Sequence, residues 1–97
     1  TGGGGFIGSN IVAALEQRGQ NRIVVCDAFD DNDKWHNLAK RDLYNCIDPK
    51  QLFTYMESQK AQIQVVFHMG AISSTTEKNV DLILDQNYRT TMNLLQW

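Results

Sequence analysis

The chain has 97 residues, a formal net charge of −2 at pH 7 and 42% hydrophobic residues, so it forms one domain at most. The acidic balance argues against a broad nucleic-acid surface, and no apolar run is long enough to span a membrane. Cys26 and Cys46 lack metal-ligand or redox spacing, which favours a reduced, cytoplasmic setting, with Cys26 in a buried strand and Cys46 in a later connection.

A glycine-dense turn over residues 1–10 leads directly into a predicted helix. Gly2, Gly5 and Gly8 lack a β-carbon where the chain must turn tightly, where a ligand must approach and where the helix must pack closely on a strand. The helix is predicted to end at Gly19, and its apolar face comprises Ile7, Ile11, Val12 and Leu15. Its unpaired N–H groups suit an anionic diphosphate; a glycine-rich loop without a ligand is the alternative.

Residues 22–27 predict a buried strand that ends at Asp27, roughly 20 residues beyond the turn. At that position a carboxylate accepts hydrogen bonds from the adenosine ribose of a dinucleotide, with Ala28 beside it. A solvated acid is the alternative. Because turn, helix, strand and acid follow in this order, the sequence favours a dinucleotide-binding fold.

The loop after this strand carries both acids and a lysine. Asp30, Asp31 and Asp33 resemble a calcium loop, but no glycine occupies the required turn position and Trp35 falls where an oxygen ligand is needed. No metal site is therefore predicted. Lys34, with Lys40 and Arg41 further along, forms a cationic edge that suits a 2′-phosphate, and a solvated lysine is the alternative.

Residues 37–43 predict a short third strand ending at Asp42, a secondary candidate for contact with the adenine. Asp48, Pro49 and Gln51 then combine an N-cap acid, a proline at the first helical position and a glutamine three residues after the cap. They predict the start of a helix whose Leu52, Phe53 and Met56 pack in the core.

Residues 64–69 are apolar and β-rich, which predicts a fourth parallel strand. His68 lies at its C-terminal end and is interpreted as structural rather than catalytic. Met69, Gly70 and Ala71 follow, and the two small residues suit a backbone that passes close to the cofactor.

The next loop contains Ser73, Ser74, Thr75, Thr76 and Glu77. Ser74 or Thr76 with Glu77 provides capping chemistry for a last helix. That helix is predicted to bury one stripe, comprising Val80, Ile83, Leu84, Thr91, Leu94 and Leu95, with Asn87 on the same face. A polar amide on a core face needs partners, so Asn87 is predicted to hydrogen-bond the backbone around the cofactor site.

These motifs together resemble the extended short-chain dehydrogenase/reductase family, which includes nucleotide-sugar epimerases and dehydratases. The turn is similar to the family's opening, and the later motifs follow in its order: Asp27, Asp42-Leu43, residues 68–71 and residues 87–95. Residues 34–38, 70–77 and 85–88 more narrowly resemble the ADP-glyceromanno-heptose 6-epimerases. Gly4, Met69 and Ile72 depart from the commoner family pattern.

The resemblance implies a cytoplasmic, NADP-dependent epimerase, homo-oligomeric when full length, that acts on an ADP-heptose nucleotide sugar for lipopolysaccharide core biosynthesis. Bound cofactor would remove hydride from the heptose C6 and return it to the opposite face. The cofactor-binding set implied is Gly2, Gly5, Phe6, Ile7, Gly8, Asp27, Ala28, Lys34, Asp42, Met69, Gly70, Ala71, Ser73 and Asn87, and the substrate-binding set is Ser74 and Thr75. The family's Tyr-x-x-x-Lys pair would lie beyond Trp97, so no catalytic residue is assigned.

The predicted fold is therefore an α/β doubly wound parallel sheet of Rossmann type, truncated at both ends, in which residues 1–97 lack the first strand and the substrate-binding part. Such a fragment is expected to be inactive alone. Two alternatives stay open: another nucleotide-sugar epimerase or dehydratase, and a non-catalytic NAD(P)-binding sensor. NAD also stays open as the cofactor, because Asp27 by itself favours a free 2′-hydroxyl.

Overall fold

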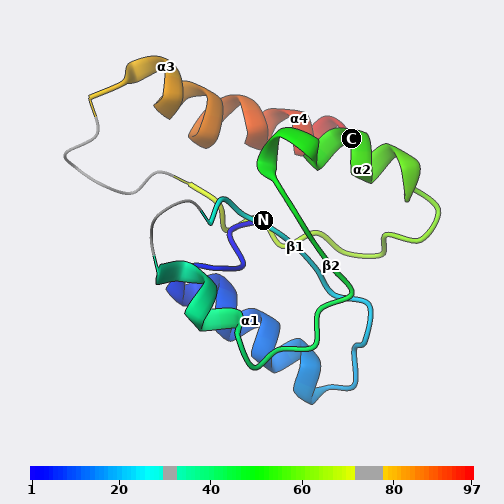
Figure 1. The fold of residues 1–97 in the computed structure, drawn as a ribbon. Coiled ribbons are helices and arrows are strands. Elements are labelled where there is room, and N and C mark those ends of the chain that lie inside the picture. The colour runs from blue at the N-terminus through cyan, green and yellow to red at the C-terminus, as the bar shows by residue number, and fades with distance from the viewer. Residues whose placement is uncertain (30–32, 72–77) are drawn as a thin grey trace.

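The computed structural model describes residues 1–29, 33–71 and 78–97. Its centre is a parallel pair of strands, β1 (Val24–Cys26) and β2 (Asn45–Ile47), in which Val25 lies opposite Cys46. The other elements, in chain order, are α1 (Phe6–Gln17), η1 (Asp33–Leu38), η2 (Pro49–Gln51), α2 (Leu52–Ser58), α3 (Val80–Ile83), η3 (Leu84–Arg89) and α4 (Thr90–Gln96). Helices lie on both faces of the strands, with α1 on one side and α2 and α4 on the other (Figure 1).

Two apolar clusters explain this layering. Because successive residues of a strand point to opposite faces, Val25 belongs to one cluster and Cys26 to the other. The first cluster joins β1 to α1 and η1 through Val12, Ile23, Val25 and Leu38. The second joins both strands to α2 through Cys26, Ile47, Leu52 and Met56, with Leu94 and Trp97 packed against it. The predicted α/β class is confirmed, whereas the doubly wound strand order stays a prediction.

Several predicted boundaries are also confirmed. The helix α1 starts directly after Gly5 and ends before Gly19, which adopts a φ of +82° that favours glycine. At the start of η2, the Asp48 carboxylate accepts a hydrogen bond from the Lys50 N–H at 2.8 Å. The Gln51 side chain accepts one from the Asp48 N–H at 3.4 Å, which completes the predicted capping box.

The predicted strand over residues 37–43 is wrong. The chain instead forms the 3₁₀ helix η1 and a turn, because Leu38 packs against α1 in the first cluster. The strand beside β1 lies further along, at β2, and it contains Cys46, which was expected in a connection. If the predicted strand before Thr1 is counted as the first, β2 is the third strand. The acid that directly follows the third strand is then Asp48 rather than Asp42.

Residues 64–69 are extended but are not a strand of the described sheet. Their backbone instead bonds Thr1, whose ammonium group donates to the Phe67 oxygen at 2.7 Å and whose oxygen accepts from the Met69 N–H at 3.1 Å. On the other side, the Gly2 N–H donates to the Cys26 oxygen at 2.8 Å. Thr1 and Gly2 thus lie between β1 and residues 67–69, and a ladder this short forms no strand.

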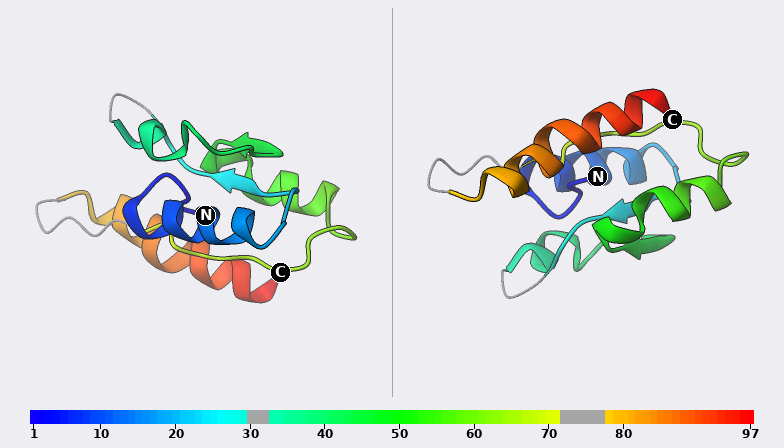
Figure 2. Two further views of the ribbon diagram at one scale, coloured as in Figure 1. Left: turned by 90° about the horizontal axis from the view of Figure 1, so that it is seen from below. Right: turned by 90° about the horizontal axis from the view of Figure 1, so that it is seen from above.

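The C-terminal rod formed by α3, η3 and α4 runs beside the extended segment (Figure 2). Its N-cap is Asn79, whose side chain accepts from the Leu82 N–H at 3.1 Å, so the predicted cap at Ser74 or Thr76 is wrong. The predicted buried stripe is also wrong, since Val80 and Leu95 are 66% and 77% exposed. Among the described side chains, those of the rod's C-terminal end, Leu94 and Trp97, pack against the second cluster.

The two cysteines should differ in reactivity towards alkylation. Burial raises the pKa of the Cys26 thiol to about 11, and it also raises the pKa of Cys46, which is nevertheless exposed. At pH 8 we expect iodoacetamide to modify Cys46 in the native protein and Cys26 only after unfolding, as mass spectrometry of tryptic peptides would show. Equal labelling of both cysteines in the native protein would contradict the packing of β1.

Candidate dinucleotide site

The glycine turn is closed by its own backbone. Gly2 has a φ of +71°, and the Gly2 oxygen accepts a hydrogen bond from the Gly5 N–H at 3.1 Å. A β-carbon added to Gly8 would overlap the Gly2 oxygen and lie 2.9 Å from the Gly3 α-carbon. A β-carbon on Gly2 would lie 2.6 Å from the Gly70 nitrogen. Gly2 and Gly8 are therefore required by the packing of the chain itself.

Gly5 has a different environment. It is the N-cap of α1 with a φ of −75°, and an added β-carbon would meet only the Gly2 oxygen, at an ordinary 3.5 Å. No side chain in the described part of the chain caps this helix end, and Phe6 and Ile7 are 83% and 60% exposed. The first-turn N–H groups have no partner within the helix and lie at the positive end of its dipole. This end of α1 has the chemistry of an anion site.

Asp27 lies against the turn at the end of β1. One carboxylate oxygen, Oδ2, accepts from the Gly4 N–H at 2.9 Å, and the other, Oδ1, accepts from the Ala28 N–H at 2.8 Å. The Lys34 ammonium lies 3.2 Å from Oδ1, and the two side chains are 10% and 41% exposed for Asp27 and Lys34 respectively. The acid therefore supports the turn, and the lysine offsets its charge on the solvent side.

Asn37 is a supporting residue that the sequence analysis missed. Its side-chain amide donates to the Gly4 oxygen at 2.8 Å, so η1 and Asp27 together fix both polar groups of the Gly4 peptide backbone. Gly4 itself has little room, since an added β-carbon would lie 2.7 Å from the Phe29 ring. Asn37 falls within the segment predicted as a strand, where its side chain gave no signal of a bond to the turn.

The segment after residue 67 closes the turn from the opposite side. The Gly70 N–H donates to the Thr1 hydroxyl at 3.0 Å, which places Gly70 against Gly2, whereas the predicted approach of Gly70 to a cofactor stays a prediction. His68 bonds Thr1 Oγ1 through Nδ1 at 2.6 Å and Thr91 Oγ1 through Nε2 at 2.8 Å. Burial lowers the pKa of the His68 imidazole, and the Thr1 ammonium group lowers it further. The structural interpretation of this histidine is thus supported.

The remaining predicted site residues differ in where they lie. The Asp42 N–H donates to the Glu16 carboxylate at 3.3 Å, near the far end of α1 and about 15 Å along the helix from Phe6. Asn87 lies in η3 and is exposed rather than on a core face, and its backbone oxygen accepts from the Thr91 hydroxyl at 3.2 Å. Met69 is 41% exposed and Ala71 ends the segment. Ser73, Ser74 and Thr75 lie outside the described residues.

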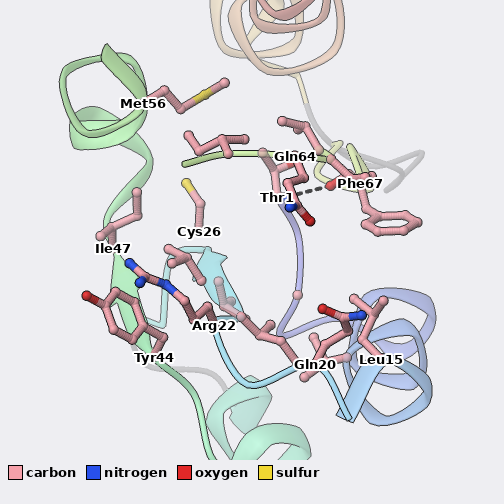
Figure 3. A pocket seen from close by; sticks show the side chains of 18 of the residues that line it. Thr1, Leu15, Gln20, Arg22, Cys26, Tyr44, Ile47, Met56, Gln64 and Phe67 are labelled. Carbon is pink, nitrogen blue, oxygen red and sulfur yellow. Dashed lines mark hydrogen bonds between the residues drawn. The ribbon is translucent and has the colours of Figure 1, made fainter. Parts of the chain in front are cut away.

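A mainly apolar cavity lies on the inner side of α1, and Gly3 and Gly8 of the turn also line it. It holds about 550 Å³ between β1 and residues 64–67, with α1 and α2 on its two sides (Figure 3). Its labelled lining includes Leu15, Cys26, Met56 and Phe67, with Thr1 at one end, where the bond to the Phe67 oxygen is drawn. The cavity has the place and apolar lining of an extended strand beside β1 rather than those of a phosphate site.

Within residues 1–29, 33–71 and 78–97, no three His, Cys, Asp or Glu side chains gather to hold a metal ion. No helix in the described part of the chain combines the length and apolar composition needed to cross a bilayer.

Comparison with known proteins identifies relatives of the whole chain. Residues 1–97 match the model of the NAD dependent epimerase/dehydratase family. The curated ADP-L-glycero-D-manno-heptose-6-epimerases of Pseudomonas paraeruginosa and Pseudomonas aeruginosa are each 36% identical over 97 residues, and that of Cupriavidus pinatubonensis is 35% identical. Each alignment covers 99% of this chain and 29% of the relative, so the chain spans under a third of the length of these proteins.

Proposed function

Because the chain belongs to the NAD dependent epimerase/dehydratase family, whose members share a Rossmann-type α/β fold, we propose that the full-length protein epimerises an ADP-activated heptose at C6. NADP bound at the glycine turn would supply a transient oxidation, and the product would serve lipopolysaccharide core biosynthesis in the cytoplasm. The observation that carries the dinucleotide site is the meeting of three features: the glycine turn, the start of α1, which no side chain of the described residues caps, and the Asp27 carboxylate.

The residues fit such a cofactor. Gly5 leaves room for a diphosphate to approach the turn, and the N–H groups of Phe6 and Ile7 can donate to it. Asp27 retains lone pairs beyond its bonds to Gly4 and Ala28, which can accept from the ribose. A bound nicotinamide cofactor would supply reversible hydride-transfer chemistry, and the residues of this chain would bind and orient it.

Lys34 is proposed to select NADP over NAD. It lies 3.2 Å from Asp27, so its charge reduces the repulsion that the carboxylate exerts on a 2′-phosphate. An exposed lysine–phosphate contact contributes about 1 kcal/mol. We therefore expect Lys34→Ala in the full-length protein to weaken NADP binding several-fold and to leave NAD binding almost unchanged, as calorimetric titration of both cofactors would measure.

The matched control is Lys60→Ala, which removes the same charge after the end of α2, where Lys60 lies 5.5 Å from the Trp97 ring centre. It should leave both affinities near the wild-type values. An equal loss of NAD and NADP affinity in Lys34→Ala would show that Lys34 does not recognise the 2′-phosphate. Tighter binding of NAD than NADP by the wild type would overturn the preference itself.

We also propose that residues 1–97 are part of a larger doubly wound domain. The cavity beside β1 matches the place of a parallel strand that runs into Thr1, whose backbone already bonds residues 67–69 while that of Gly2 bonds β1. The resemblance puts the catalytic Tyr-x-x-x-Lys pair beyond Trp97. We therefore expect residues 1–97 alone to give no turnover, and measurable epimerisation by the isolated chain would contradict this proposal.

The reaction is tested by incubating the full-length protein with ADP-heptose and following the configuration at C6 by NMR. Conversion of one C6 epimer into the other supports the proposal. Conversion only of other nucleotide sugars would favour another epimerase or a dehydratase, and dinucleotide binding without any turnover would favour a sensor module.

We also propose that the full-length protein is a homo-oligomer. Analytical ultracentrifugation would measure its mass in solution.

A further inference from the structure

A continuous chain of hydrogen bonds connects the glycine turn to the C-terminal rod. It runs from the Gly70 N–H to the Thr1 hydroxyl (3.0 Å), to His68 Nδ1 (2.6 Å), from His68 Nε2 to the Thr91 hydroxyl (2.8 Å), and on to the Asn87 oxygen (3.2 Å). The turn and the rod are thus joined through one imidazole ring, although they are far apart in sequence.

The Asn87 end of these hydrogen bonds fixes which ring nitrogen of His68 carries a proton. The Gly70 N–H can only donate, so Thr1 Oγ1 accepts there and keeps its own hydrogen and a second lone pair for His68 Nδ1. The Asn87 backbone oxygen can only accept, so the Thr91 hydroxyl donates to it and accepts from His68 Nε2. His68 therefore carries a proton on Nε2. Burial lowers the pKa of His68 below its ordinary value, so the ring is neutral at pH 7 and Nδ1 accepts from the Thr1 hydroxyl.

The Thr1 end of this series of hydrogen bonds lies where the backbone of the glycine turn is packed closely against residues 69–70. Gly2 has a positive φ, and an added β-carbon there would lie 2.6 Å from the Gly70 nitrogen, so the two backbones must keep a fixed separation. The Thr1 hydroxyl bonds both Gly70 and His68 at this contact. Movement of the His68 side chain would consequently move Thr1, and with it the start of the glycine turn, relative to the Gly70 backbone.

We propose that His68 is a positioning residue: as the Nε2–H tautomer it ties Thr1 to Thr91 and so fixes the glycine turn in its dinucleotide-binding geometry. This role rests on the proposed dinucleotide site. It acts through Thr1 and requires no contact between His68 and the cofactor.

The test combines the imidazole signature with affinity in the full-length protein labelled with ¹⁵N-histidine. For the wild type we expect His68 nitrogen shifts of a protonated Nε2 and an unprotonated Nδ1 at pH 7. Thr91→Val keeps the side-chain shape but removes the hydroxyl, so we expect mixed tautomers and NADP binding weakened about fivefold. Thr91→Ser returns the hydroxyl and should restore both the tautomer and the affinity.

Three results would overturn this role. A wild-type His68 with its proton on Nδ1 contradicts the deduced proton order. Wild-type tautomer and affinity in Thr91→Val would show that the bond to Thr91 positions nothing. If the wild type bound no dinucleotide at all, the proposed function would fail together with this role, whereas normal wild-type binding with an unaffected Thr91→Val would remove the role of His68 alone.

Discussion

We expect Gly8→Val in the full-length protein to abolish measurable dinucleotide binding. A β-carbon at Gly8 overlaps the Gly2 oxygen and approaches the Gly3 α-carbon at 2.9 Å, and both atoms belong to backbone that cannot rotate away. The turn must therefore move off the start of α1. Displacement of this kind costs about 3 kcal/mol or more, so the affinity should fall by at least about 100-fold and the melting temperature should drop.

Two other glycines separate the effect on the fold from the effect on the ligand. Gly5→Ala introduces a β-carbon with only an ordinary contact, so the melting temperature should stay close to wild type while affinity falls about tenfold, because the methyl group faces the diphosphate. Gly19→Ala, at the other end of α1 with a φ of +82°, should lower stability by about 1 kcal/mol and leave affinity unchanged. Calorimetric titration and thermal unfolding measure both. Unchanged affinity in Gly5→Ala would contradict the placement of the diphosphate.

Removal of the Asp27 side chain should affect both cofactors. In Asp27→Ala the N–H groups of Gly4 and Ala28 lose their acceptor, and Lys34 loses the carboxylate that lies 3.2 Å from its ammonium group. Unsatisfied donors of this kind cost about 1–3 kcal/mol each. We expect NAD and NADP affinity both to fall by at least about tenfold, with a lower melting temperature.

Asp27→Asn provides the matched comparison. The amide keeps one oxygen that can accept from the turn but loses the charge that repels a 2′-phosphate. NAD affinity should therefore fall more than NADP affinity, and the melting temperature should stay closer to wild type than in Asp27→Ala. Full NAD affinity in both variants, measured by titration, would exclude Asp27 from the ribose site.

Local signals account for the parts of the fold that the sequence predicted correctly. The glycine turn, the apolar face of α1 and the stop at Gly19 all depend on neighbouring residues, as does the capping box at Asp48. Residues 22–27 predicted β1 because four consecutive residues there, 23–26, are apolar. Each of these features is decided within about one or two turns of chain.

The errors involve contacts between distant segments. The strand β2 contains only three residues, including the polar Asn45, and pairing with β1 rather than composition defines it. Leu38 was predicted to lie in a strand, yet it belongs to a 3₁₀ helix and packs in one cluster with Val12. Because the strand was predicted too early in the chain, Asp42 was chosen in place of Asp48 as the acid that follows it. Residues 64–69 were predicted from composition, but strand pairing requires a neighbour that only Thr1 and Gly2 provide here.

The supporting residues of the candidate site were missed for the same reason. Asn37 reaches Gly4 and Thr91 reaches His68 across separations of 33 and 23 residues, and neither side chain belongs to a local motif. His68 itself was correctly interpreted as structural, although its two partners were not identified. Periodicity and capping rules describe neighbours along the chain, so they carry no information about such bonds.

The most direct test of the central claim is a crystal structure of the full-length protein with NADP. We predict diphosphate oxygens within hydrogen-bonding distance of the Phe6 and Ile7 N–H groups at the start of α1, with the adenosine ribose beside Asp27. A dinucleotide whose diphosphate lies away from the start of α1, for example deep in the apolar cavity beside β1, would contradict this placement.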